Sequence, residues 1–159
     1  MIYENLNCKE IRIFAMSKDE PRFKNKTYLD VQTDFFKGDL VKAKAKEKEK
    51  EKCEFLYYRN GIKISGDTLV LFKFDNQIIA SAIVTDCKKK SEVRHGVEHK
   101  GALYIDDSTI KVFKPISISK LLKEIPNLKY STRGSSKIEI ENLDIIIQLI
   151  NKNIYNSAI

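Results

Sequence analysis

The densest apolar run in the chain lies between Gly66 and Val84, in the stretch GDTLVLFKFDNQIIASAIV. β-Branched and aromatic residues fill Thr68–Phe74 and Ile78–Val84, and the intervening Asp75-Asn76 tolerates the positive φ angles of a tight turn. This pattern predicts a β-hairpin. Because apolar side chains occupy both faces of each run, we expect central strands that are covered on two sides.

Upstream of the hairpin, the apolar pattern predicts one strand and one helix. Residues Glu10–Met16, EIRIFAM, alternate with the period of a strand. From Thr27, a suitable N-cap, apolar residues recur at helical spacing as far as Gly38-Asp39, which we expect to interrupt the helix. Farther on, an Asn60-Gly61 turn within Glu54–Ile64 predicts a small hairpin or bulge.

Downstream of the hairpin, polar residues predict a loop over Thr85–Gly101. Two short apolar runs, Ala102–Ile105 and Thr109–Phe113, flank Asp106-Asp107-Ser108 and predict a second hairpin that Pro115 closes. The remaining segments are, in chain order, a helix Ile118–Ile125 with Ser117 or Ser119 as its N-cap, a loop Lys129–Ser136, a strand Ile138–Ile140 and a helix from Leu143 to Ile154 with Asn142 as its N-cap. Strands outnumber helices, so we expect an α+β fold with a strongly curved mixed sheet or small β-barrel and flanking helices.

Length and composition indicate one domain over residues 1–159, because a chain of this size buries about 70% of its unfolded surface. Within it, Lys42–Lys52 reads KAKAKEKEKEK, a pattern that stabilises neither a helix nor a strand, so we expect an exposed, mobile segment. The three cysteines are widely spaced, which indicates a reducing cytoplasm rather than a disulfide framework or a zinc ribbon. No apolar run reaches the length of a membrane span, about 18 residues, so we expect no membrane partner.

Charge is the main indication of a partner. Lys and Arg together number 29 and Asp and Glu 22, which gives a net charge of +7. Lys111–Lys137 holds six lysines and one arginine against one acid, whereas Ile138–Ile159 holds three acids against one lysine. Clustered cations gain affinity for phosphates by releasing condensed counterions, so this asymmetry favours a polyanionic partner.

From Lys63 onward the order of elements resembles the PUA-like superfamily, and within it the EVE, YTH and ASCH branches. The resemblance rests on Gly66-Asp67 before a strand, Val70-Leu71-Phe72, Ile79-Ala80-Ser81-Ala82, Phe113-Lys114-Pro115-Ile116-Ser117, Lys120-Leu121-Leu122 and Tyr130-Ser131. The chain departs from EVE and YTH members in having no tryptophan. The resemblance implies a curved barrel whose mouth accepts a flipped or single-stranded modified base, stacked on aromatic side chains beside a basic rim.

Charge and resemblance together predict a nucleic-acid-binding domain that reads a modified base in DNA or RNA, with no catalytic residue, cofactor or metal. The candidate binding residues are Lys88, Lys89, Lys90, Arg94 and Lys100 in the polar segment, and Tyr130, Ser131, Arg133 and Ser135 in the later loop. We expect the polar segment to contact phosphate and Tyr130 to stack on a base. The hydroxyls and the guanidinium after Tyr130 suit a phosphate or a base edge.

Two other function classes stay open. The ASCH resemblance implies a small hydrolase of modified nucleosides or nucleotides that uses a lysine, a threonine and an acid; residues of these types are Lys73, Thr68, Thr85 and Glu139. A protein-interaction domain would need its lysines only for solubility. His95-Gly96-Val97-Glu98-His99 matches the zinc motif H-x-x-E-H, but Gly96 disfavours the rigid helix that such a site needs, so a solvated loop is the better interpretation.

Overall fold

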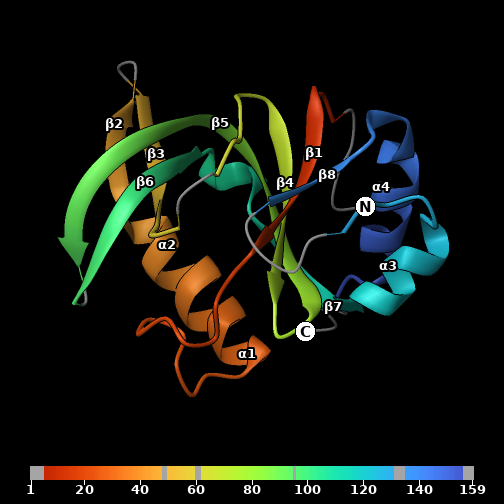
Figure 1. The fold of residues 1–159 in the computed structure, drawn as a ribbon, viewed down its shortest axis with the longest axis horizontal. Helices are drawn as coiled ribbons and strands as arrows, with labels where there is room; N and C mark the ends of the chain where they lie inside the picture. The colour runs from red at the N-terminus through yellow and green to blue at the C-terminus, as the bar shows by residue number, and fades with distance from the viewer. Residues whose placement is uncertain (1–5, 48–49, 60–61, 95, 131–134, 156–159) are drawn as a thin grey trace.

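The structure, a computed structural model, describes residues 6–47, 50–59, 62–94, 96–130 and 135–155. Within these residues, eight strands form one curled, open sheet with helices on both of its sides (Figure 1). The strand order is β2-β3-β6-β5-β4-β1-β8, and β7 pairs with β5 beside this path. β1 and β4 are parallel, whereas the other pairs are antiparallel. The predicted α+β fold with a strongly curved mixed sheet is therefore confirmed.

The strands are β1 (Glu10–Ala15), β2 (Lys44–Glu47), β3 (Lys50–Tyr57), β4 (Thr68–Phe74), β5 (Gln77–Arg94), β6 (Val97–Ile105), β7 (Lys111–Ser117) and β8 (Ser135–Ile138). The helical segments are α1 (Tyr28–Asp30), η1 (Val31–Asp39), α2 (Leu40–Lys42), η2 (Asp107–Thr109), α3 (Ile118–Glu124), η3 (Ile140–Asn142) and α4 (Leu143–Lys152). Because α1, η1 and α2 follow one another without a gap, we call them together the first helix. None of the described helices is long and apolar enough to cross a membrane.

β4 and the first half of β5 form the predicted central hairpin. Asp75 and Asn76 have φ angles of 51° and 62°, as the tight turn requires. On one face of β4, Phe72 enters an aromatic core under the first helix. On the other face, Leu69 and Leu71 enter an aliphatic core against α3 and α4. The first half of β5 divides its side chains between the two cores in the same way, so both strands of the hairpin are covered on two sides as predicted. β1 also contributes side chains to both cores.

Thr27 caps the first helix as predicted. Its hydroxyl accepts a hydrogen bond from the backbone N–H of Asp30, and the Asp30 carboxylate accepts one from the N–H of Thr27. The predicted interruption at Gly38 is wrong, because η1 continues through this residue in a wider, π-helical winding. Leu40 explains the continuity, since its side chain is buried in the aromatic core and its N–H bonds to the carbonyl of Phe35.

A buried glutamine fastens the first helix to the sheet and to the segment after α4. The Gln32 amide nitrogen donates to the carbonyl oxygens of Ile79, at 2.8 Å, and Phe113, at 2.7 Å. Its amide oxygen accepts a hydrogen bond of 2.7 Å from the hydroxyl of Tyr155. Gln32 thus joins one helix, two strands and the residues after α4 through a single side chain.

The prediction of a polar loop over Thr85–Gly101 is wrong, because this segment continues β5 and begins β6. Among the residues that the structure describes, the part of β5 beyond Val84 pairs only with β6. We call Lys88–Arg94 of β5 and Val97–Lys100 of β6 the arm. Apart from Val93 and Val97, the arm carries polar side chains, so its sequence lacks the apolar alternation that indicates a strand.

The second predicted hairpin is also wrong, because β6 and β7 do not pair with each other in the described part of the chain. Both strands lie along β5 on the side opposite β4, β7 beside its first residues and β6 beside its later ones. Pro115 does not end the strand but lies inside β7. An edge strand tolerates a proline because it pairs on one side only.

The lysine-rich segment Lys42–Lys52 contains β2 and the start of β3, which pair with each other. Its exposure and mobility stay predictions, as does the single-domain organisation of the whole chain. β3 pairs with β6 and not with Ile62–Ile64, which lies outside the strands, so the small hairpin predicted there is absent from the described residues. The Asn60-Gly61 turn itself lies outside them.

The carboxyl-terminal elements follow the predicted order. Ser117 caps α3 by accepting a hydrogen bond from the N–H of Lys120. β8 begins at Ser135 and ends at Ile138, so the strand predicted over Ile138–Ile140 lies too far along the chain. Asn142 precedes α4, but its side chain makes no capping hydrogen bond.

The close approach of β6 to Tyr57 leads to a stability prediction. A methyl group at Gly101 would overlap the phenol of Tyr57 and lie 2.8 Å from the carbonyl oxygen of Lys88. We expect Gly101→Ala to lower the free energy of unfolding by about 1–3 kcal/mol, measured by chemical denaturation. Gly38→Ala is the matched control, because its nearest neighbour, a carbonyl oxygen 3.3 Å away, leaves more room. Equal stability of both variants and the native chain would contradict this account.

A buried histidine at the start of the arm leads to a pH prediction. His99 is 1% exposed, and neither ring nitrogen has a hydrogen-bond partner among the described residues. Burial, reinforced by the positive charge of Arg22, lowers the pKa of His99 below its ordinary value of 6.5. Below that pH the unfolded chain binds a proton that the folded chain does not, so this histidine contributes stability that is lost as the pH falls.

We therefore expect His99→Leu to remove part of the loss of stability between neutral and mildly acidic pH, measured by denaturation at each pH. His95→Leu, at the other histidine in the sequence, is the control. If the free energy of unfolding depends on pH in the same way in the native chain and in His99→Leu, then His99 has the same pKa in the folded and the unfolded chain, and this account is wrong.

Candidate nucleic-acid interface

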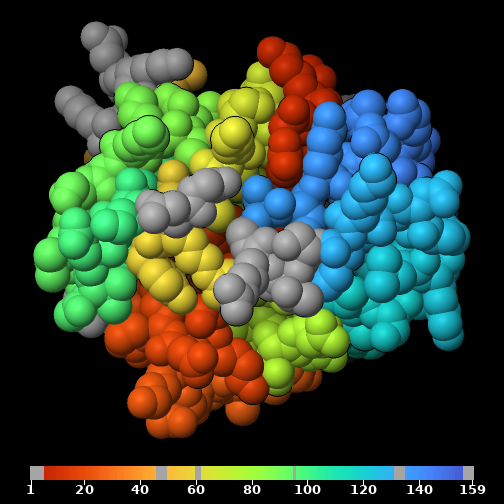
Figure 2. Space-filling view, viewed as in Figure 1, coloured from red at the N-terminus to blue at the C-terminus, as the bar shows by residue number. Residues whose placement is uncertain are grey.

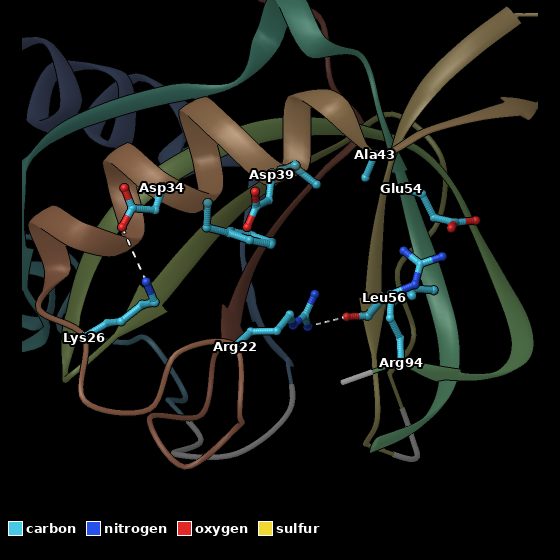
Figure 3. Close-up of a pocket in the computed structure, with 10 residues that line it drawn as sticks. Arg22, Lys26, Asp34, Asp39, Ala43, Glu54, Leu56 and Arg94 are labelled. Carbon is cyan, nitrogen blue, oxygen red and sulfur yellow. Dashed lines mark hydrogen bonds and ion pairs between the residues drawn. The ribbon is translucent and has the colours of Figure 1, made fainter. Parts of the chain in front are cut away.

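A cleft of about 350 Å³ lies between the first helix, the loop after β1, and β3 (Figure 3). Its lining residues are Arg22, Lys26, Asp34, Phe35, Asp39, Leu40, Ala43, Glu54, Leu56 and Arg94. We call it the helix–strand cleft. Three cationic, three acidic and four apolar side chains line it, so it is neither a purely basic channel nor a purely apolar pocket.

Arg22 is fixed on one side of the cleft. Its guanidinium pairs with the buried carboxylate of Glu20 and donates to the carbonyl oxygen of Leu56 at 2.7 Å (Figure 3). It also lies 5.3 Å from the ring centroids of Phe35 and Phe55, close enough for a cation–π interaction. With 13% of its side chain exposed, Arg22 forms a rigid, charged part of the wall.

Glu54, on β3, is the matching buried acid. Lys90 Nζ donates to its Oε2 at 2.6 Å, and the Tyr104 hydroxyl donates to the same oxygen at 3.1 Å. The hydrogen bond to Glu54 raises the pKa of Lys90 above its ordinary value, so this lysine stays charged.

The remaining charged groups of the cleft are more exposed. Lys26, just before the first helix, and Asp34, in its amino-terminal half, form an ion pair with a nitrogen–oxygen distance of 3.4 Å (Figure 3). Arg94 reaches the cleft from the arm and pairs with Glu92. Exposed pairs of this kind contribute little to stability, so their members can exchange partners when a charged ligand binds.

The structure divides the predicted binding residues between two places. Lys88, Lys89, Lys90, Arg94 and Lys100 all lie on the arm, which forms one flank of the molecule (Figure 2). Of these, Arg94 lines the helix–strand cleft, and Lys90 bonds to Glu54, which lines it. Lys88 pairs with Asp86 at 4.0 Å and Lys100 with Glu98 at 3.7 Å, so the arm carries acids between its cations.

Tyr130 and Ser135 lie elsewhere. Ser135 lines a second cleft of about 320 Å³, which shares no lining residue with the helix–strand cleft. The lining residues of this second cleft are Ile125, Asn127, Leu128, Lys129, Ser135, Ser136, Lys137, Glu139 and Asn142. Tyr130 packs against the aliphatic core, with Lys73 Nζ 5.3 Å from its ring centroid, and its buried hydroxyl has no hydrogen-bond partner among the described residues. Ser131 and Arg133 lie outside the described residues.

The residues of the alternative chemistries are not gathered in either cleft. The hydroxyl of Thr68 donates to the carbonyl of Ser65, and that of Thr85 donates to the carbonyl of Tyr104, so both are engaged with backbone. Glu139 lines the second cleft. His99 lies on a strand rather than in a solvated loop, and His95 lies outside the described residues. The described residues contain no group of three or more metal-ligating side chains.

Sequence reasoning missed the buried charges of the helix–strand cleft. Arg22 follows Pro21 in a polar stretch that predicts only a loop, and Glu54 opens the run Glu54–Tyr58, where an acid precedes apolar residues. The one signal in the sequence was an acid, Glu54, beside a run of apolar residues that forms a buried strand. That signal could not reveal that Lys90, far along the chain, forms the ion pair with Glu54.

No family model matches the sequence, and no curated protein is significantly similar to it. Comparison with solved structures finds the ASCH protein of Zymomonas mobilis: a single-residue variant aligns at 9% identity and a TM-score of 0.53 over 87% of this chain and 95% of that one. The unsubstituted ASCH protein aligns at 10% identity and a TM-score of 0.50, over 87% and 94%. The N-terminal domain of Thermococcus gammatolerans McrB bound to m5C DNA aligns at 12% identity over 91% and 98%, with a TM-score of 0.48. At the level of fold, the predicted resemblance to the PUA-like superfamily is confirmed by the likeness to ASCH.

Proposed function

We propose that this chain is a PUA-like nucleic-acid-binding domain that holds one base in the helix–strand cleft and phosphates along the arm. The observation that carries the proposal is that the arm and the helix–strand cleft are adjacent and share a residue. Lys90 and Arg94 belong to the arm, yet Lys90 bonds to Glu54 in the cleft wall and Arg94 lines the cleft. A nucleic acid bound on the arm therefore presents its bases beside the cleft.

The composition of the cleft favours a base over a phosphate. Its volume falls within the range of small-molecule pockets, about 300–1,000 Å³. Glu54, Asp34 and Asp39 would repel a phosphate, whereas their carboxylates accept hydrogen bonds from the amino and imino groups of a base. Phe35 and Leu40 supply an apolar surface for the ring.

The PUA-like resemblance supports a finer proposal, that the base is a modified one in DNA or RNA. The apolar side chains of the cleft offer a surface for an added methyl group. Comparing plain and methylated oligonucleotides of one sequence tests this, and equal affinity for both would leave a general nucleic-acid binder. Incubation with acylated and methylated nucleosides, followed by chromatography, tests the alternative of a hydrolase, which predicts product.

Filling each cleft in turn shows which one holds the base. Ala43 lines the helix–strand cleft and Asn127 lines the second cleft. We expect Ala43→Phe to fill the cleft and exclude the base. The binding free energy of a single-stranded oligonucleotide, measured by fluorescence anisotropy titration, should then weaken by roughly 1–3 kcal/mol, the contribution of one stacked base. Asn127→Phe, the matched control, should bind as the native chain does. The reverse result would move the base site to the second cleft, beside Tyr130 and Ser135.

Charge removal tests the arm. We expect replacement of Lys88, Lys89 and Lys100 by Gln to weaken binding to every sequence alike and to lower the slope of log K against log salt by about one for each phosphate that the arm no longer neutralises. The control carries the same charge change on the exposed lysines Lys114, Lys123 and Lys152. A lower slope in the control alone would place the phosphates away from the arm. An absence of binding by the native chain at low salt would overturn the proposed function itself.

A further inference from the structure

The arm extends beyond the rest of the sheet. Residues after Lys89 in β5 and before Gly101 in β6 pair with each other and, in the described part of the chain, with no third strand. Figure 1 shows them as a long, curved ribbon at one side of the molecule. His99 is buried and Lys90 bonds to Glu54, so part of the arm packs against the rest of the molecule, whereas Val93, Arg94 and Glu98 are exposed. An isolated ribbon of two strands is only marginally stable in water, and core packing does not explain the exposed part of the arm.

The arm carries an apolar residue where core packing does not explain it. Val93 immediately precedes Arg94, the last residue of β5. Its exposed fraction, 73%, is the largest among the exposed large hydrophobic residues that the structure describes. It pairs across the ribbon with Glu98, whose side chain is 58% exposed. Lys89 and Lys100 are exposed nearer the base of the arm. Val93 thus lies near the free end of the arm, and the lysines lie nearer its base. In a nucleic-acid groove, the base edges form the floor and the phosphates form the rims, so Val93 would face the bases and the lysines the phosphates.

We propose that the arm enters the major groove of a B-form DNA duplex, with Val93 against the base edges and the lysines behind it on the phosphates. This inference rests on the proposed function and names its nucleic acid. Paired strands lie about 4.8 Å apart, and the B-form major groove, about 12 Å wide, admits a ribbon of two strands. The A-form major groove of RNA is deep and narrow, so duplex RNA does not admit the arm.

The chemistry of Val93 predicts what it contacts. In the major groove, the C5 methyl group of thymine is the apolar feature of the base edges, and a valine side chain packs against it. The facing Glu98 carboxylate suits the amino group of cytosine, which is a donor in the same groove. The exposed ion pair of Lys100 with Glu98 is weak, so Lys100 can move to a phosphate at little cost.

The test compares nucleic acids and one matched pair of variants in anisotropy titrations. The probes are a DNA duplex, an RNA duplex of the same sequence, and a DNA duplex in which uracil replaces every thymine. The variants are Val93→Ser and, as the control, Leu29→Ser, which makes the same kind of change at a residue on α1 that is 50% exposed. Both sites are at the surface, and melting of each variant checks that it folds.

We expect the native chain to bind the DNA duplex about tenfold or more tightly than the RNA duplex. Val93→Ser is expected to weaken binding to the DNA duplex about threefold to tenfold, and Leu29→Ser to leave it unchanged. Uracil should weaken binding of the native chain and have no effect on Val93→Ser, because serine at this position offers the thymine methyl group no apolar partner.

Equal affinity of the native chain and Val93→Ser for the DNA duplex, or of the native chain for the two duplexes, would overturn the inference about the arm. The proposed function would survive that outcome if Ala43→Phe still weakened binding of single strands. If the native chain binds none of the probes and no single strand, the proposed function fails and the inference fails with it.

Discussion

Strand β4 buries both of its faces, and the rest of the architecture follows from this requirement. A strand covered on two sides needs a separate apolar layer for each face. The first helix supplies the aromatic layer over Phe72, and α3 with α4 supplies the aliphatic layer over Leu69 and Leu71. The sheet curls between these layers, and the helix–strand cleft lies between the first helix, the loop after β1, and β3.

Two anchored charges give the cleft its character. Arg22 is held by a buried carboxylate, a backbone carbonyl and aromatic rings, and Glu54 is held by a lysine and a tyrosine hydroxyl. Buried charges are tolerated when their hydrogen bonds are satisfied, and groups held this firmly lose little further entropy when a ligand arrives. The same Lys90 that neutralises Glu54 also fixes the base of the arm, so the shape of the cleft and the position of the arm depend on one interaction.

Local signals in the sequence were sufficient for elements that are determined locally. The turn at Asp75-Asn76, the cap at Thr27 and the apolar faces of β1 were predictable because each depends on neighbouring residues. The arm was not, because its mostly polar side chains show no apolar alternation, and such a sequence resembles a loop. The pairing of β6 and β7 with β5 was missed because strand pairing is non-local, and the cleft was missed because Arg22 and Glu54 meet only in the folded chain.

The hydrogen bonds of Gln32 make one wall of the cleft depend on a residue far along the chain. The first helix, which forms this wall, is held to the sheet by an amide group that also accepts a hydrogen bond from the hydroxyl of Tyr155, beyond α4. A truncation before Tyr155, or a fused partner that displaces it, would therefore act on the cleft from the opposite end of the sequence. Tyr155 thus holds one wall of the cleft in place, although it lies far from that wall in the sequence.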